Sequence, residues 1–158
     1  GYNRMGFSVL KKLNQLKKNV LVVDYNPQPI HSLIKNKVPC IYGDISDNEI
    51  IKHMNLKHAN LIISTVTNVR DNILLIKKVK QQNRKALVVV AASHPQEAYK
   101  LYSHKADYVI IPHLTGGQYI ALLLEKGEKN QAFLTNERRH QLAHIKAHRD
   151  WNNHQSSL

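Results

Sequence analysis

The sequence predicts a doubly wound α/β fold with a parallel sheet, and three observations lead to that prediction. Segments of helical periodicity alternate with short apolar segments, and the connections between them are short. The first six residues place Gly1 and Gly6 in a turn at the start of an amphipathic run. A Val/Leu strand then ends at Asp24, 18 residues after Gly6. Glycine turn, helix, strand and acid follow one another in this order in a dinucleotide-binding βαβ unit.

Each expected element rests on its local pattern. Helices are expected over residues 5–17, 27–35, 69–82, 94–103, 118–125 and 135–149, with a further short helix that Ser46 or Asp47 caps and that reaches Met54. Strands are expected over residues 19–24, 38–42, 60–64, 86–92 and 108–111. Thr115-Gly116-Gly117 is expected to open the helix over 118–125, and Pro112 to stop the last strand. The strand that should precede the glycine turn would lie at the centre of such a sheet, so the chain is expected to be a piece of a longer protein.

Composition limits the function classes. A hydrophobic fraction of 42% is enough to bury a core, and no window holds 18 consecutive apolar residues. The single cysteine, Cys40, excludes an internal disulfide and is expected to be a small core residue. The net charge of +12 favours polyanions, but the lysines are not interleaved with aromatic residues, so no specific nucleic-acid partner is expected.

The glycine turn predicts a phosphate site. Glycine lets the backbone turn tightly and approach a pyrophosphate, and the helix N-terminus supplies N–H donors and partial positive charge. Asn3 stands where G-x-G-x-x-G has its second glycine; it tolerates a left-handed φ, but its amide can occupy phosphate space. Asp24 is either the acceptor for a ribose, which favours NAD over NADP, or a solvated strand-end carboxylate. Arg4 is either a phosphate ligand or a surface arginine.

A set of motifs in order resembles a known family. These motifs are Gly1-Tyr-Asn-Arg4-Met-Gly6, Val22-Val-Asp24, Tyr42-Gly43-Asp44, Ser64-Thr65 followed by Asp71-Asn72, and Ala106-Asp107-Tyr-Val-Ile-Ile-Pro112. Over about residues 1–125 the chain resembles the RCK or TrkA-N nucleotide-binding regulatory domain, in particular the C-terminal cytosolic domain of Kef-type potassium/proton antiporters. Three departures from the pattern are Asn3, Lys18 at an expected helix-ending glycine, and Lys105 at a small residue.

The resemblance implies roles for individual residues. It places Gly1, Asn3, Arg4, Met5 and Gly6 in the phosphate turn and Asp24 at the adenosine ribose. It also places Asp44 and Ile45 beside the adenine, although Asp44 is equally read as a turn-forming residue that caps locally. Thr65 would cover the nucleotide from the neighbouring strand. The ligand would be NAD(H) or an adenine nucleotide (ATP, ADP or AMP), with binding weakened or lost if Asn3 blocks the phosphate turn.

The resemblance also implies an organisation. Residues 1–112 would form the nucleotide-binding domain, 113–134 a crossover and dimerisation region, and 135–158 a charged helix with a polar tail. The helix over 118–125 is apolar nearly all round, so it must be covered on most sides, by a partner subunit or by a domain core. The resemblance implies that a second subunit is the cover. A homodimer at the cytoplasmic face of the cell membrane, with a transmembrane transporter domain upstream, would gate ion transport without catalysis.

Two other functions remain open from the residues themselves. The phosphate turn and Asp24 fit a fragment of an NAD-dependent oxidoreductase equally well, and the net charge fits a basic polyanion-binding module. His140, His144 and His148 share one helix face, but no cysteine or acid accompanies them at fixed spacing, so a pH-sensitive surface is favoured over a metal site. Ser64-Thr65 lacks a G-x-S-x-G elbow, which gives a hydrolase little support.

Overall fold

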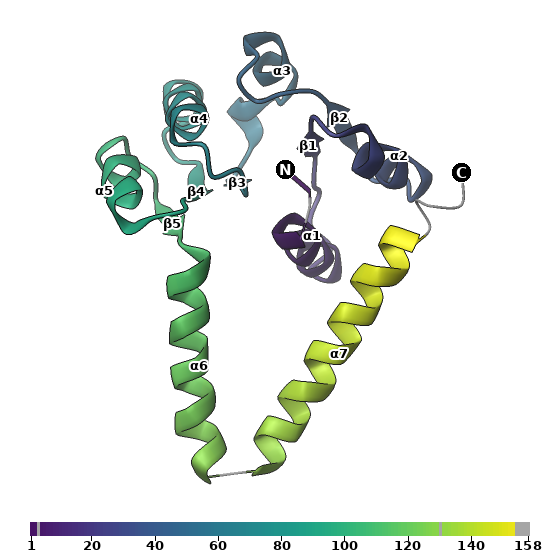
Figure 1. The fold of residues 1–158 in the computed structure, drawn as a ribbon. Coiled ribbons are helices and arrows are strands. Elements are labelled where there is room, and N and C mark those ends of the chain that lie inside the picture. Colours follow the sequence, from purple (N-terminus) through teal and green to yellow (C-terminus); the bar gives the residue numbers. More distant parts are fainter. Residues whose placement is uncertain (3, 130, 154–158) are drawn as a thin grey trace. The chain divides into compact units, whose positions relative to one another are not determined.

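A computed structural model describes residues 1–2, 4–129 and 131–153 of the 158-residue chain. The described chain divides into two compact units, residues 1–111 and the helices that begin at Pro112. Each unit is described by itself (Figure 1).

The first unit alternates helices and strands. Its helices are α1 (Arg4–Gln15), α2 (Pro27–Lys35), α3 (Asn48–His53), the 3₁₀ turn η1 (Leu56–His58), α4 (Val69–Gln82) and α5 (Pro95–Ser103). Its strands are β1 (Val22–Asp24), β2 (Cys40–Tyr42), β3 (Leu61–Ser64), β4 (Leu87–Ala91) and β5 (Tyr108–Ile110). All five predicted strands are present, each shorter than expected, because the flanking residues lie in the connections rather than in ladder pairs.

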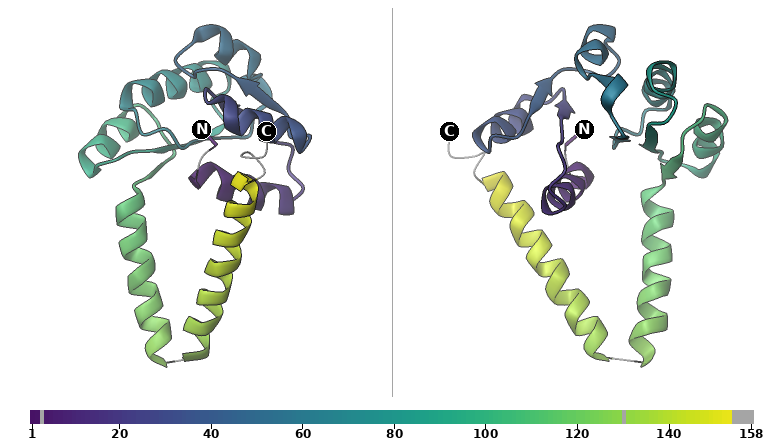
Figure 2. Two further views of the ribbon diagram at one scale, coloured as in Figure 1. Left: turned by 45° about the vertical axis from the view of Figure 1, so that its right-hand side comes forward. Right: turned by 180° about the vertical axis from the view of Figure 1, so that it is seen from behind.

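All strand pairs are parallel, which confirms the predicted α/β class. β1 pairs with β2, with Val22 opposite Cys40, and β3, β4 and β5 pair in that order. The two sets of strands share no ladder (Figure 2). The pairing orders β2-β1 and β3-β4-β5 are those of the two halves of a Rossmann-like sheet, in which the centre of the sheet lies between β1 and β3.

Side-chain burial explains why these segments hold together. β4 has the most apolar sequence, and Val88, Val90 and Ala91 are fully buried. Helix α4 lays Leu75, Ile76 and Val79 into the same core. Val88, Val90 and the three α4 residues belong to one cluster that extends from β1 across β3 to β5, so the packing of α4 on the strands is the centre of the unit.

Helix starts follow ordinary capping chemistry. Asn26, Asp47 and Asn68 each sit at the N-cap in extended conformation and accept a hydrogen bond from a backbone N–H of the first turn. Asp47, and not Ser46, is the cap of α3. Pro27 occupies the first turn of α2, where its missing N–H costs nothing.

Helix ends depart from the usual glycine. Four non-glycine residues that follow helices have positive φ: Lys17 (52°), Lys37 (55°), Asn55 (50°) and Lys105 (74°). After α2, the N–H of Val38 donates to the Leu33 carbonyl, which closes the turn around Lys37. The glycine-like position after α1 is therefore Lys17, and the prediction of Lys18 was wrong by one residue, because the helix ends at Gln15 and not at residue 17 as its apolar pattern indicates.

The second unit consists of α6 (Pro112–Lys129) and α7 (Gln131–Asn153). The expected start of α6 near Gln118 was wrong, because Pro112 begins the helix and Gly116 and Gly117 lie inside it. α7 also extends beyond the predicted 135–149 at both ends. Within the described residues, neither of these helices nor any other combines the length and the apolar character that a bilayer crossing requires.

Close contacts join α6 to α7. A Cβ on Gly127 would lie 2.8 Å from side-chain atoms of Leu134, so glycine lets the two helices approach there. The Tyr119 hydroxyl donates to the Glu137 carboxylate, which raises the pKa of that hydroxyl. The ammonium of Lys126 lies 5.7 Å from the centre of the Phe133 ring. The two helices therefore form a hairpin.

Candidate functional site

The first residue of the chain connects the two sets of strands. The Gly1 nitrogen donates to the carbonyl of Val23 in β1 at 3.0 Å. The Thr65 hydroxyl, directly after β3, donates to the Gly1 carbonyl at 2.8 Å. The glycine turn therefore lies between the carboxyl ends of β1 and β3, which is the switch point where α/β sheets of this kind bind ligands.

Both glycines of the turn lie where a side chain would meet close neighbours. A Cβ on Gly6 would lie 2.4 Å from the Gly1 carbonyl oxygen, and a Cβ on Gly1 would lie 2.9 Å from the Thr65 hydroxyl oxygen. No side chain fits at Gly6 without moving backbone. The turn is thus as tight as the sequence pattern predicts, and it leads directly into the N-terminus of α1.

The Asp24 carboxylate is buried and organises this turn. One of its oxygens accepts the Tyr2 N–H at 2.5 Å, and the other accepts the Asn26 N–H at 2.8 Å. Its side chain is 7% exposed, so it is not the solvated strand-end carboxylate of the alternative reading. A carboxylate has about four acceptor positions, so two remain for a ribose hydroxyl.

The other predicted site residues lie around the same end of the strands. Asp44 is exposed, and its carboxylate accepts the Ser46 N–H at 2.8 Å, which is the geometry of the local turn-capping alternative. Ile45 is buried in the core beside β1. Arg4 begins α1 with an exposed side chain, and Met5 is half-buried. Asn3 lies outside the described residues.

Sequence reasoning assigned no role to Asn72, which the structure places directly behind the site. This fully buried side chain donates to the carbonyls of Val66 at 2.8 Å and Ala91 at 2.9 Å. It therefore fixes the connection that carries Thr65 to the end of β4. The signal that could have found it is a polar residue on the apolar face of the α4 pattern.

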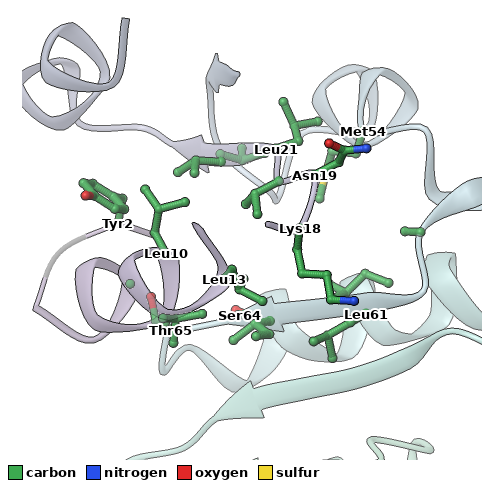
Figure 3. Close-up of a pocket in the computed structure, with 18 of the residues that line it drawn as sticks. Tyr2, Leu10, Leu13, Lys18, Asn19, Leu21, Met54, Leu61, Ser64 and Thr65 are labelled. Atoms are coloured by element: carbon green, nitrogen blue, oxygen red, sulfur yellow. The ribbon is translucent and has the colours of Figure 1, made fainter. Parts of the chain in front are cut away.

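A cavity of about 910 Å³ runs between β1 and β3. Leu10 and Leu13 of α1 line it together with residues 20–23 and 61–65. Figure 3 shows Tyr2 and Thr65 at one end and Lys18, Asn19 and Met54 at the other. Along both strands the lining of this cavity is mostly apolar, from residues 20–23 on one side and 61–63 on the other.

The remaining candidates contribute no assembled site. Within the part of the chain that the structure describes, no three His, Cys, Asp or Glu side chains are grouped to hold a metal ion. Cys40 is half-buried in β2, opposite Val22. The assembled chemistry is therefore that of the glycine turn, Asp24 and Thr65: N–H donors, a buried carboxylate and a hydroxyl around a helix N-terminus.

The comparison with protein families agrees with this geometry. The family model described as the TrkA-N domain matches residues 1–112, which is most of the chain and all of the first unit. The chain belongs to the TrkA-N domain family. The match includes every candidate site residue, from Gly1 to Thr65.

Relatives of this TrkA-N domain are much longer. Potassium channel protein 1 of Methanocaldococcus jannaschii is 24% identical over 123 residues, a stretch that covers 77% of this chain and 37% of that protein. The chain therefore spans about a third of the length of this relative.

Solved structures share the TrkA-N fold. The TrkA-N domain of the inner membrane protein ybaL from Escherichia coli superposes with a TM-score of 0.74 at 19% identity, over 78% of this chain and 92% of that one. The Kef C-terminal domain of Shewanella denitrificans in its AMP-bound form has a TM-score of 0.67 at 16% identity, over 96% and 94%. The GsuK channel bound to NAD has a TM-score of 0.68 at 24% identity, over 86% and 24%.

Proposed function

We propose that this TrkA-N domain is the cytosolic nucleotide-sensing part of a potassium transport protein, either an antiporter or a channel. It would bind NAD(H) or an adenine nucleotide at the carboxyl ends of β1 and β3. The observation that carries the proposal is the assembly of Gly1, Asp24 and Thr65 around the N-terminus of α1.

Each part of a nucleotide would find a matching group. The phosphates would lie against the Gly1–Gly6 turn and the first turn of α1, with Arg4 as their cation. The ribose would donate to the free acceptor positions of Asp24, and Thr65 would cover the ligand from β3. Asp44 and Ile45 follow β2, so we place the adenine beside them. The Kef domain with AMP and the GsuK channel with NAD support the ligand class.

The sensor would act by population shift and not by catalysis. A nucleotide that prefers one arrangement of the assembled protein stabilises it by the difference in affinity, which biases the attached ion pathway. We place a homodimer contact on the 118–125 segment of α6, since Ile120 is 59% exposed and Leu124 is 68% exposed. Residues 113–134 would then be the crossover region, and 135–158 an appended region of charged helix and polar tail.

Isothermal titration tests the proposal. NAD, NADH, ATP, ADP and AMP are titrated into the purified chain, and at least one is expected to bind saturably. Asp24→Asn removes the charge but keeps one acceptor, and we expect it to weaken binding about tenfold or more. Asp47→Asn is the matched control, because Asn caps α3 equally well away from the turn.

Two outcomes overturn the proposal separately. A folded chain that ignores all five nucleotides removes the sensor function. A chain that binds a nucleotide but remains monomeric in sedimentation at about 0.1 mM leaves the sensor and removes the α6 dimer. Loss of binding in both Asp variants would mean that the substitutions merely destabilise the carboxyl ends of the strands, and a thermal melt of each variant detects such destabilisation.

A further inference from the structure

The charges of the first unit are segregated between the two ends of its strands. The five connections that lead from a helix into a strand, together with the last residues of the helices before them, carry exposed cations: Lys17, Lys18, Lys35, Lys37, Lys57, Arg84, Lys85 and Lys105. The acid in these connections is Asp107, and it already pairs with Lys80 at 2.6 Å. The unit's six other acids lie at the opposite end, after a strand or in the first turn of a helix: Asp24, Asp44, Asp47, Glu49, Asp71 and Glu97.

The five helix-to-strand connections, with the last residues of the helix before and the first residue of the strand after each, form one continuous surface, called here the amino edge. The Val22 N–H donates to the Pro39 carbonyl, which joins the connections before β1 and β2. The Asn83 side chain donates to the carbonyls of Lys57 and Ala59, which joins those before β3 and β4. The Lys80 ammonium donates to the Ala86 carbonyl and pairs with Asp107, which joins the connections before β4 and β5. The α1–β1 and η1–β3 connections line the same end of the central cavity.

Helix dipoles account for the sign of this segregation but not for its size. Each helix C-terminus carries about half a negative charge, so five helices at the amino edge supply roughly −2.5. Eight exposed cations exceed that several-fold. A large positive excess therefore remains on one end of the unit, available to an anionic partner.

Apolar side chains stand among these cations. Four large ones at the amino edge are more than half exposed: Leu16 (53%), Ile34 (60%), Leu87 (55%) and Tyr108 (53%). Leucine, isoleucine and tyrosine beside lysines suit the boundary between headgroups and acyl chains. A nucleic-acid surface would favour arginine forks and stacked aromatic platforms, whereas seven of the eight cations here are lysines.

We propose that the amino edge docks on the anionic headgroups of a lipid bilayer. Lysines would supply diffuse attraction to phosphate and carboxylate groups, and Leu16 and Ile34 would enter the interface. The proposal rests on the proposed function for the presence of a membrane. It also orients the domain, because the nucleotide turn at the other end of the strands would face bulk water.

Vesicle cosedimentation tests this docking. The purified 158-residue chain is mixed with phosphatidylcholine vesicles that contain either no phosphatidylserine or about 30% of it, at about 0.1 M salt. We expect binding only to the anionic vesicles. Three substitutions, Lys18→Gln, Lys35→Gln and Lys85→Gln, should lower the partition coefficient on the order of 100-fold, since each lysine near an anionic surface contributes about fivefold. These three lysines have ordinary negative φ, so the variant should fold.

A matched variant controls for net charge. Arg138→Gln, Arg139→Gln and Lys146→Gln remove three exposed cations from α7 and should leave the partition coefficient within about twofold. Equal losses in both variants, or binding to neutral vesicles alone, would overturn the proposal, as would tighter salt-resistant retention of duplex DNA. Nucleotide titration of the same variants separates the two proposals: an unchanged affinity with no vesicle binding leaves the sensor and removes the lipid surface.

Discussion

The hydroxyl of Thr65 donates to the carbonyl of Gly1 across 64 positions of sequence, at 2.8 Å. Gly1 in turn donates to Val23, so this hydrogen bond couples the end of β3 to the end of β1 through the glycine turn. Asn72 extends the coupling to β4 by holding the carbonyl of Val66, the next residue. The residues proposed to contact nucleotide are therefore positioned by one another.

Removal of the Thr65 hydroxyl should weaken nucleotide binding more than folding. Thr65→Val keeps the shape and loses the donor, so Kd should rise about tenfold, as expected for one hydrogen bond. Thr65→Ser keeps the donor and should stay within about threefold. Titration calorimetry measures both, and Thr67→Val, at an exposed position in the same connection, is the control. Equal affinities of the Val and Ser variants would contradict the coupling.

Replacement of Asn72 should destabilise the first unit strongly. Asn72→Leu leaves the buried carbonyls of Val66 and Ala91 without their donor, which should lower the free energy of unfolding by about 2–4 kcal/mol. Asn72→Asp adds a buried charge against two carbonyl oxygens, and only its protonated form can donate. Urea unfolding should therefore show the Asp variant recovering stability relative to wild type between about pH 7 and pH 4. If the difference in stability between wild type and the Asp variant did not change with pH over that range, the role of the Asn72 side chain as hydrogen-bond donor would be contradicted.

Glycine should stabilise the helix ends where lysine has positive φ. At Lys37, with φ of 55°, glycine relieves left-handed strain of about 1 kcal/mol and loses a smaller favourable interaction with the helix dipole. We expect Lys37→Gly to raise Tm by about 2 °C. Lys35→Gly, inside α2, removes the same charge without relieving strain and should lower Tm by a similar amount. Calorimetry measures the Tm of both variants. A lower Tm in both would contradict the proposed backbone strain at Lys37.

Lowering the pH should destabilise the first unit partly through protonation of Asp107. Burial by itself raises the pKa of this carboxyl, but the hydrogen bonds from Lys80 and the Val88 N–H and the charge of Lys80 together lower its pKa below the ordinary 3.8. A lowered pKa stabilises the folded state above about pH 3.8, and this contribution is lost as pH falls through the folded value. Asp107→Asn should therefore show a smaller loss of stability than wild type between pH 5 and pH 3. If the urea unfolding midpoints of the two proteins fell by the same amount between pH 5 and pH 3, this prediction would be refuted.

Hydrophobic periodicity and the positions of turn residues predicted the fold class, all five strands and the α-helices of the first unit. The strands could be found because each is a short apolar run between turn residues. Helix α6 was the larger error, since Gly116 and Gly117 indicate a turn locally although the helix continues through them. The apolar face of α4 marks Asn72 as an unusual polar residue, but its two acceptors, Val66 and Ala91, are set by the tertiary fold and no local pattern reveals them. The sequence predicts that α6 carries many apolar side chains, but it does not identify the surface that buries them.

The separation of β1 from β3 has a consequence for local opening. β1 and β2 form a two-stranded ladder of three residues each, whereas β3, β4 and β5 form a three-stranded sheet over the largest part of the core. A two-stranded pair is marginal by itself, so it opens at lower free energy than the larger sheet. Amide hydrogens of Ile41 and Val23 should exchange with solvent deuterium before those of Val88 and Val90. A ligand that bridges the glycine turn would slow exchange first in the smaller sheet, which makes those amides a reporter of occupancy.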